Sequence, residues 1–97
     1  MGDAALKAEG DGRLVLSGVL DFASVPGIWE QLREQISPQQ DLQVSLGEVT
    51  SANSAALVLL LEARHQAADQ GANISFSQLP QGLSDLAMLS NADDLIA

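Results

Sequence analysis

The feature that most constrains the fold of this sequence is the alternation of strand-like and helix-like segments along most of its length. A glycine-rich turn signal at residues 9–12 separates a weak strand candidate, residues 4–8, from a convincing one, residues 14–20. The first two strands are expected to form a hairpin with the first at an edge, and the later ones, separated by helices, to join through right-handed parallel crossovers. The order β-β-α-β-α-β-α therefore predicts an α/β fold with helices packed on a mixed β-sheet of about four strands.

The spacing of apolar residues assigns the individual segments. Residues 25–36 carry them at i, i+3, i+4, i+7 and i+11, which predicts a helix that Ser24 caps, with Pro26 in its first turn. Residues 42–46 and 74–77 alternate apolar and polar side chains, as strands do. The polar stretch 47–54 is expected to be a loop. Helices are expected over residues 55–70, ended by Gly71, and over residues 81–89, whereas residues 91–97 are left unassigned.

Length and charge limit the possible functions. Ninety-seven residues, of which 46% are hydrophobic, are enough for one core and predict a single domain over residues 1–97. Thirteen acidic residues against four basic ones give a net charge of -9, which disfavours direct binding to nucleic acid or to an anionic membrane surface. The longest apolar run, residues 55–61, is too short to cross a bilayer, and no signal peptide is visible. We therefore expect a cytoplasmic protein.

Residues suited to chemistry are few. The sequence contains no cysteine, and its one histidine, His65, has no nucleophile or orienting carboxylate at motif spacing, so a solvated helix face is expected for it. Asp85, Asp93 and Asp94 lack the spacing of a calcium loop, and no phosphate-binding glycine loop or nucleophile elbow is present. We expect no catalytic residues, no metal, no cofactor, no small-molecule substrate and no enzyme activity. Trp29 is expected in the core, with an anchor at a partner interface as the alternative.

The most informative candidate site is the segment 50–56, which follows the predicted central strand and leads into the second helix. In parallel α/β folds, ligands and partners usually bind beyond the carboxyl ends of strands, and a helix N-terminus exposes unpaired N–H groups. A phosphate on Ser54 would be tolerated there but would disturb a docked partner. The alternative is simple helix capping by Asn53 or Ser54, worth about 1 kcal/mol. The candidate partner-binding or phosphorylatable residues are Thr50, Ser51, Asn53, Ser54, Ala55 and Leu57.

Two short motifs resemble those of STAS domains, the family of anti-sigma factor antagonists and their relatives. Gly18-Val19-Leu20-Asp21 is similar to the family's Gly-x-Leu-Asp signature at the end of the second strand. Residues 49–61 resemble the segment in which Asp-Ser or Asp-Thr and small residues open an aliphatic helix. The element order also matches. Within the family, the small size, Ile28-Trp29-Glu30 and residues 56–61 resemble the small cytoplasmic STAS subunits of the Mla phospholipid-transporting ABC complexes of Gram-negative bacteria.

The resemblance implies a regulatory or assembly subunit that binds the ATPase of an ABC transporter and so contacts the inner membrane only indirectly. Such a complex moves phospholipid between the inner membrane and a periplasmic carrier and maintains outer-membrane lipid asymmetry. The alternative is an anti-sigma factor antagonist whose partner switch is controlled by phosphorylation of Ser54, which matches the family's hydroxyl position. Asn53 stands where the family usually has Asp, and Ala55-Ala56 replaces its Gly. Both departures favour steady docking over a phosphate switch.

Overall fold

Residues 3–89 fold into one four-stranded sheet and three helices. The computed structural model describes residues 3–89, and the sheet order is β1-β2-β3-β4, with β1 antiparallel to β2 and the other neighbours parallel. This confirms the predicted α/β order, the mixed sheet and the edge position of the first strand. The elements are β1 (Ala5–Gly10), β2 (Arg13–Leu20), α1 (Val25–Gln35), β3 (Asp41–Ala52), α2 (Ser54–Asp69), β4 (Asn73–Ser77) and α3 (Gln81–Leu89).

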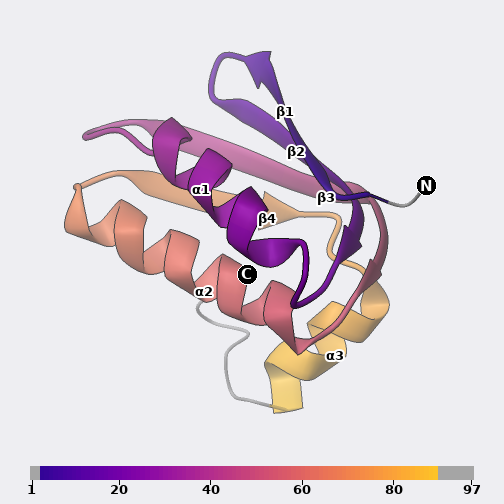
Figure 1. The fold of residues 1–97 in the computed structure, drawn as a ribbon. Helices are drawn as coiled ribbons and strands as arrows, with labels where there is room; N and C mark the ends of the chain where they lie inside the picture. The colour runs from indigo at the N-terminus through magenta and orange to yellow at the C-terminus, as the bar shows by residue number, and fades with distance from the viewer. Residues whose placement is uncertain (1–2, 90–97) are drawn as a thin grey trace.

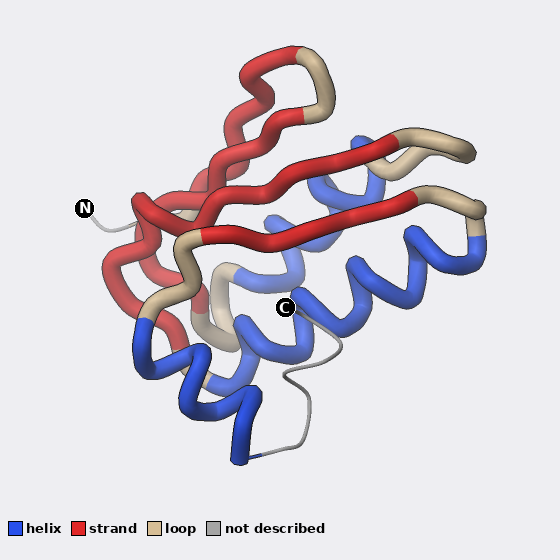
Figure 2. The backbone as a smooth tube through the Cα atoms, turned by 180° about the vertical axis from the view of Figure 1, so that it is seen from behind, coloured by secondary structure: helices blue, strands red, loops and turns tan. Residues whose placement is uncertain are grey.

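The helices α1 and α2 lie side by side on one face of the sheet, and α3 lies beside the start of α2 (Figure 1). Seen from behind, the strands are in front and the helices lie beyond them, so the described part of the chain leaves this second face uncovered (Figure 2). The strands alternate accordingly. Along β2, for example, Leu14, Leu16 and Leu20 are buried toward the helices, whereas Val15, Ser17 and Val19 are partly accessible. One-sided burial of this kind is typical of sheets with one solvated face.

The core is aliphatic, as the low aromatic content predicts. Leu16 and Leu46 of the sheet meet Leu32 of α1 and Leu60 of α2, all at most 1% exposed, and no polar or charged residue among residues 3–89 is buried. Trp29 packs against this core but is only partly buried. The expected core contact is therefore present, and part of the side chain is still accessible. The helix α3, predicted over the same residues that it occupies, buries Leu83 and Ala87.

Gly18 of the Gly-x-Leu-Asp motif has a structural reason to be glycine. Its φ is +84°, and a Cβ built there would overlap the backbone carbonyl of Asp3 and touch Ala4. Only glycine has both the freedom for this φ and the space for the close passage of the N-terminal segment. This position helps to seat the start of β1 against the end of β2.

The prediction that residues 47–54 form a loop was wrong, because β3 extends to Ala52. Its pairing with β2 continues beyond Leu46 through Ser17↔Glu48 and Leu20↔Ala52, with two register shifts in the ladder. Backbone hydrogen bonds to β2 stabilise this extension, and its side chains are mostly exposed. The polar sequence therefore looked like a loop, but it is a strand whose partly buried Val49 and Ala52 still pack against the core. Only Asn53 separates β3 from α2.

Candidate functional site

Asn53 fixes the start of α2. Its backbone is extended (φ −121°, ψ −164°), and its Oδ1 accepts a hydrogen bond of 2.9 Å from the N–H of Ala55. Its own N–H donates to the carbonyl of Leu20 at 3.2 Å, and its carbonyl accepts from the N–H of Ala56 at 3.0 Å. The capping role expected of Asn53 or Ser54 therefore belongs to Asn53. Two first-turn N–H groups are already bonded, which leaves fewer donors for an anion than an uncapped helix offers.

The predicted site residues divide into an exposed and a buried group. Thr50 and Ser51 lie at the end of β3 with exposed side chains, and Asn53 and Ser54 are exposed at the head of α2. The two apolar candidates are in the interior, Ala55 at 3% and Leu57 at 7% exposure. Leu57 belongs to the core cluster and holds α2 against it, whereas Ala55 is buried at the start of α2 without belonging to that cluster. The side chains of this set that are exposed to a partner are therefore the hydroxyl and amide residues.

An apolar hollow that the sequence did not predict lies beside Ser54. It has a volume of about 140 Å³ and lies between the first turns of α1 and α2, lined by Phe22, Val25, Pro26, Ala55 and Val58. Phe22 is 72% exposed and Val58 is 54% exposed. Phe22 comes just after the strand-end Asp21 and outside the apolar stripe of α1, and this isolated position was the only sequence signal for its exposure.

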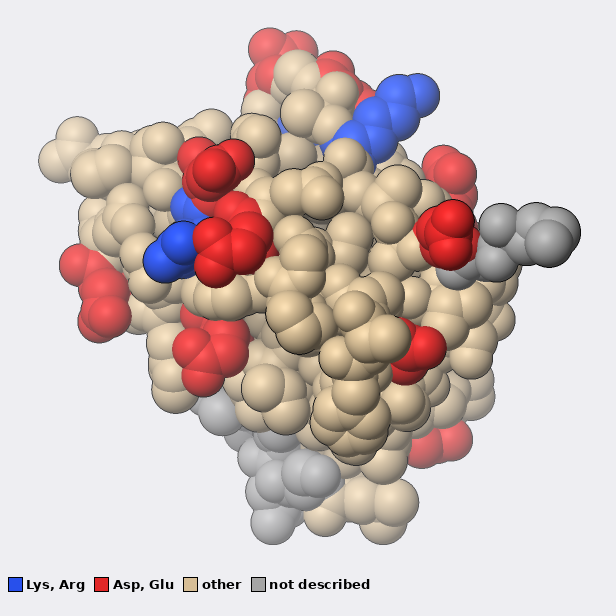
Figure 3. Space-filling view, viewed as in Figure 1, with Lys and Arg blue, Asp and Glu red and all other residues tan. Residues whose placement is uncertain are grey.

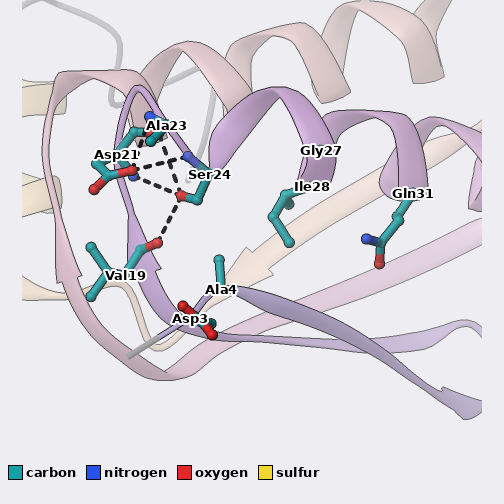
Figure 4. A pocket seen from close by; sticks show the side chains of 9 residues that line it. All are labelled: Asp3, Ala4, Val19, Asp21, Ala23, Ser24, Gly27, Ile28 and Gln31. Carbon is teal, nitrogen blue, oxygen red and sulfur yellow. Dashed lines mark hydrogen bonds between the residues drawn. The ribbon is translucent and has the colours of Figure 1, made fainter. Parts of the chain in front are cut away.

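The turn between β2 and α1 is held by Asp21 and Ser24 (Figure 4). The Asp21 carboxylate accepts from the N–H groups of Ala23 and Ser24, both at 3.0 Å, and the Ser24 hydroxyl donates to the carbonyl of Val19 at 2.7 Å and accepts from the N–H of Asp21 at 3.0 Å. Ser24 was expected to cap α1 with its side chain, and this was wrong. Its backbone is already in the helical region, so the hydroxyl points back to the turn and bonds there.

A larger hollow of about 390 Å³ lies on the β1 side of α1, and Figure 4 shows the residues around it. Asp21 and Ser24 form one wall, where their oxygens already serve the turn. Gln31 contributes an amide to the opposite part of the lining, and Asp3 adds a carboxylate from the N-terminal segment. This hollow is open and has a mixed polar and apolar lining, and the hydrogen bonds of Asp21 and Ser24 along its wall fix the turn that starts α1.

The remaining titratable candidates are placed as surface groups. His65 is exposed on α2, and the Asp85 carboxylate accepts a hydrogen bond of 2.9 Å from the Gln81 side chain. Asp93 and Asp94 lie outside the described residues. Within residues 3–89, no group of three or more His, Cys, Asp or Glu side chains could hold a metal ion, and no helix is long and apolar enough to cross a membrane.

A four-stranded mixed sheet with two helices on one face, and with hydroxyl residues at the strand-to-helix junction before α2, defines a STAS-type α/β domain. The sequence profile of the family described as "Mlab, STAS domain" matches residues 4–97. The chain belongs to this MlaB-type STAS family. STAS domains are generally non-catalytic binding modules, and membership implies that a protein partner is bound.

Solved structures of similar fold include the anti-sigma factor antagonist SpoIIAA in its unphosphorylated form, with a TM-score of 0.73, 12% sequence identity, and coverage of 97% of this chain and 85% of that one. The phosphorylated form of the Bacillus cell fate determinant SpoIIAA is also similar, with a TM-score of 0.71, 12% identity and coverage of 97% and 88%. At this identity the similarity concerns the fold. The comparison with curated proteins finds no match.

Proposed function

We propose that this protein is the regulatory or assembly subunit of an ABC transporter that moves phospholipid between membranes, and that it acts by binding the transporter's ATPase. The observation that carries this proposal is the match of the MlaB-type STAS profile to residues 4–97. The proposal treats residues 1–97 as one domain, located in the cytoplasm and peripheral to the inner membrane through the complex. It assigns the protein no catalytic step.

The proposed docking surface is the head of α2 together with the end of β3. Ser54 and Thr50 are exposed there, and the backbone beneath them is held by the hydrogen bonds of Asn53 to Leu20 and Ala55. A surface that is already rigid loses little conformational entropy when a partner binds. The net charge of -9 suits a partner with a basic patch, because complementary charge raises the association rate.

The second candidate function is an anti-sigma factor antagonist. The similarity in fold to SpoIIAA and the exposed hydroxyl of Ser54 favour it. In that role a kinase would phosphorylate Ser54 and the added charge would release the partner. The amide of Asn53 in place of the family's carboxylate argues against this switch. Mass spectrometry of the protein from its native host decides between the two, because stoichiometric phosphate on Ser54 would support the switch.

The test of the preferred function is the binding of the purified transporter ATPase to Ser54→Arg and Ser54→Glu variants, measured by biolayer interferometry. We expect Ser54→Arg to raise Kd about tenfold or more, since a bulky cation replaces a small hydroxyl in the proposed contact. Ser54 is exposed, so the free energy of unfolding should change by less than about 0.5 kcal/mol.

The matched control is Ser37→Arg. Ser37 is also exposed but precedes β3, so it lies at the other end of the sheet from Ser54, which follows β3. We expect this variant to bind the ATPase like the wild type. Equal binding by wild type, Ser54→Arg and Ser54→Glu would show that the head of α2 is not the contact. Failure of the wild type to bind at all would reject the ATPase as partner.

A further inference from the structure

Exposed apolar side chains from two separate segments meet beside Ser54. Phe22, in the turn after β2, and Val58, in the second turn of α2, are 72% and 54% exposed and line the same hollow. Val58 is four residues after Ser54, so the two side chains lie on one face of α2. The hollow therefore extends the proposed docking surface toward α1.

Folding does not account for the position of Phe22. Most large apolar residues of the described chain are in the core, whereas this phenylalanine leaves nearly three quarters of its surface in water. Single exposed apolar residues are common, but here an aromatic and a valine line one hollow together with Val25, Pro26 and Ala55. A cluster of this kind is typical of a contact that another molecule covers.

The charges around the hollow are acidic. Glu62 is exposed one helical turn after Val58, whereas the Asp21 carboxylate lies at the hollow on the β1 side of α1 and accepts from the N–H groups of Ala23 and Ser24. The four basic residues of the chain lie elsewhere. Lys7 and Arg13 are on the β1–β2 hairpin, Arg33 forms a 2.6 Å ion pair with Glu30, and Arg64 donates a hydrogen bond to the Ile74 carbonyl.

In the space-filling view, the blue surface of Lys and Arg lies over the hairpin and toward one side of the molecule (Figure 3). The area over the first turns of α1 and α2 is mostly uncharged in this view, with acidic surface at its border. An apolar centre with an acidic border is matched by an apolar side chain with basic neighbours.

We propose that the Phe22–Val58 hollow receives one apolar side chain of the partner protein, a leucine or a phenylalanine, on a segment that carries Lys or Arg within one helical turn of it. This inference rests on the proposed function, because it names the chemistry by which the partner binds next to Ser54. The apolar side chain supplies the affinity, and the basic neighbours pair with Glu62 and fix the orientation of the bound segment.

The same charges argue against two other occupants. A second copy of this chain would bring its own acidic border against this one, and the two chains would each carry -9. An anionic lipid surface would be repelled for the same reason. The hollow is also small, about 140 Å³, which suits a protein side chain better than the long acyl chain of a lipid.

The experiment measures binding of the purified ATPase to Phe22→Ser, Val58→Ser and Glu62→Gln variants at two salt concentrations. We expect Phe22→Ser to raise Kd about tenfold or more, through faster dissociation. Glu62→Gln should lower the association rate and reduce its dependence on salt. The matched control is Met88→Ser on α3, which removes a side chain that is 63% exposed but outside the hollow, and it should bind like the wild type.

Each outcome separates the inference from the proposed function. If Phe22→Ser and Val58→Ser bind the ATPase with wild-type affinity while Ser54→Arg binds it weakly, the hollow is not part of the contact, although the ATPase remains the partner. If Met88→Ser loses as much affinity for the ATPase as Phe22→Ser does, the proposal for the hollow is also rejected, because the effect would not be local to it. A wild-type dimer in sedimentation that Phe22→Ser dissociates would assign the hollow to a second copy. A wild type that does not bind the ATPase overturns both.

Discussion

Replacing Gly18 by alanine should destabilise the domain strongly, because this glycine meets two demands at once. A residue with a Cβ at φ +84° incurs the left-handed strain of about 1–2 kcal/mol. The new Cβ would also overlap the Asp3 carbonyl, a backbone atom that cannot turn aside as a flexible side chain can. The N-terminal segment would have to move, and with it Ala4, which packs against the core. Together these effects predict a loss of about 2–4 kcal/mol, from a total stability of about 5–15 kcal/mol for a domain of this size.

The measurement is urea denaturation followed by circular dichroism, with thermal unfolding as a second probe. A loss of 2–4 kcal/mol lowers Tm by roughly 10–25 °C in a domain of about 100 residues. The matched control is Gly27→Ala, which lies inside α1 with open space around a Cβ, and it should stabilise by about 0.5–1 kcal/mol.

Removing residues 2–4 from the Gly18→Ala variant separates the two causes. The overlap with Asp3 then disappears. The truncated Gly18→Ala variant should therefore have a free energy of unfolding only about 1–2 kcal/mol below that of the truncated wild type, which is the left-handed strain alone. A Gly18→Ala variant that is as stable as the wild type would refute the reasoning. The reasoning would also be refuted if Gly18→Ala lowered the free energy of unfolding equally in the full and the truncated chain, because the close passage of Asp3 would then contribute nothing.

Two further predictions concern single hydrogen bonds. Asn53→Ala removes the side-chain cap on the Ala55 N–H and should lower the free energy of unfolding by about 1 kcal/mol, whereas Asn53→Asp keeps an acceptor there and should cost nothing in urea denaturation. Arg64→Met keeps the apolar stem but loses the 2.9 Å bond to the Ile74 carbonyl on β4, and it should cost about 1 kcal/mol. Equal stability of Asn53→Ala and Asn53→Asp, or wild-type stability of Arg64→Met, would contradict the respective assignment.

The order of the elements was predictable because α1, β4 and the first half of β3 have a clear apolar period, and because turn signals such as residues 9–12 and Gly71 separate the elements. The short helix α3 was predicted at its observed bounds, and Gly71, with φ +68°, follows α2 as expected of a helix stop. The second half of β3 was not predictable. Its stability comes from pairing with β2, a long-range contact that leaves no alternation in the local sequence, and polar residues such as Glu48 and Ser51 look the same in a loop and in an exposed strand.

The place of Ser54 at the junction of β3 and α2 was predictable, but the burial of its neighbours was not. The position of Ser54 followed from the rule that strand ends and helix starts meet at one edge of a parallel sheet. The burial of Ala55 and Leu57 and the exposure of Val58 could not be inferred, because residues 55–61 are apolar without a gap and so have no period to show which side faces water. Which side of α2 is buried depends on its packing against α1 and the sheet, and these tertiary contacts cannot be read from the sequence of the helix alone.

The two parts of the proposed surface come from different motifs, yet the fold couples them. β2 and β3 are parallel neighbours, so the turn with Phe22 after β2 and the junction with Ser54 after β3 must emerge at the same edge. The hydrogen bond from Asn53 to the Leu20 carbonyl ties the two strand ends directly. Phe22 has no role in the core and Ser54 none in the cap, so either can change without unfolding the domain. Partner affinity can therefore vary through the β2–α1 turn while the junction before α2 keeps its geometry.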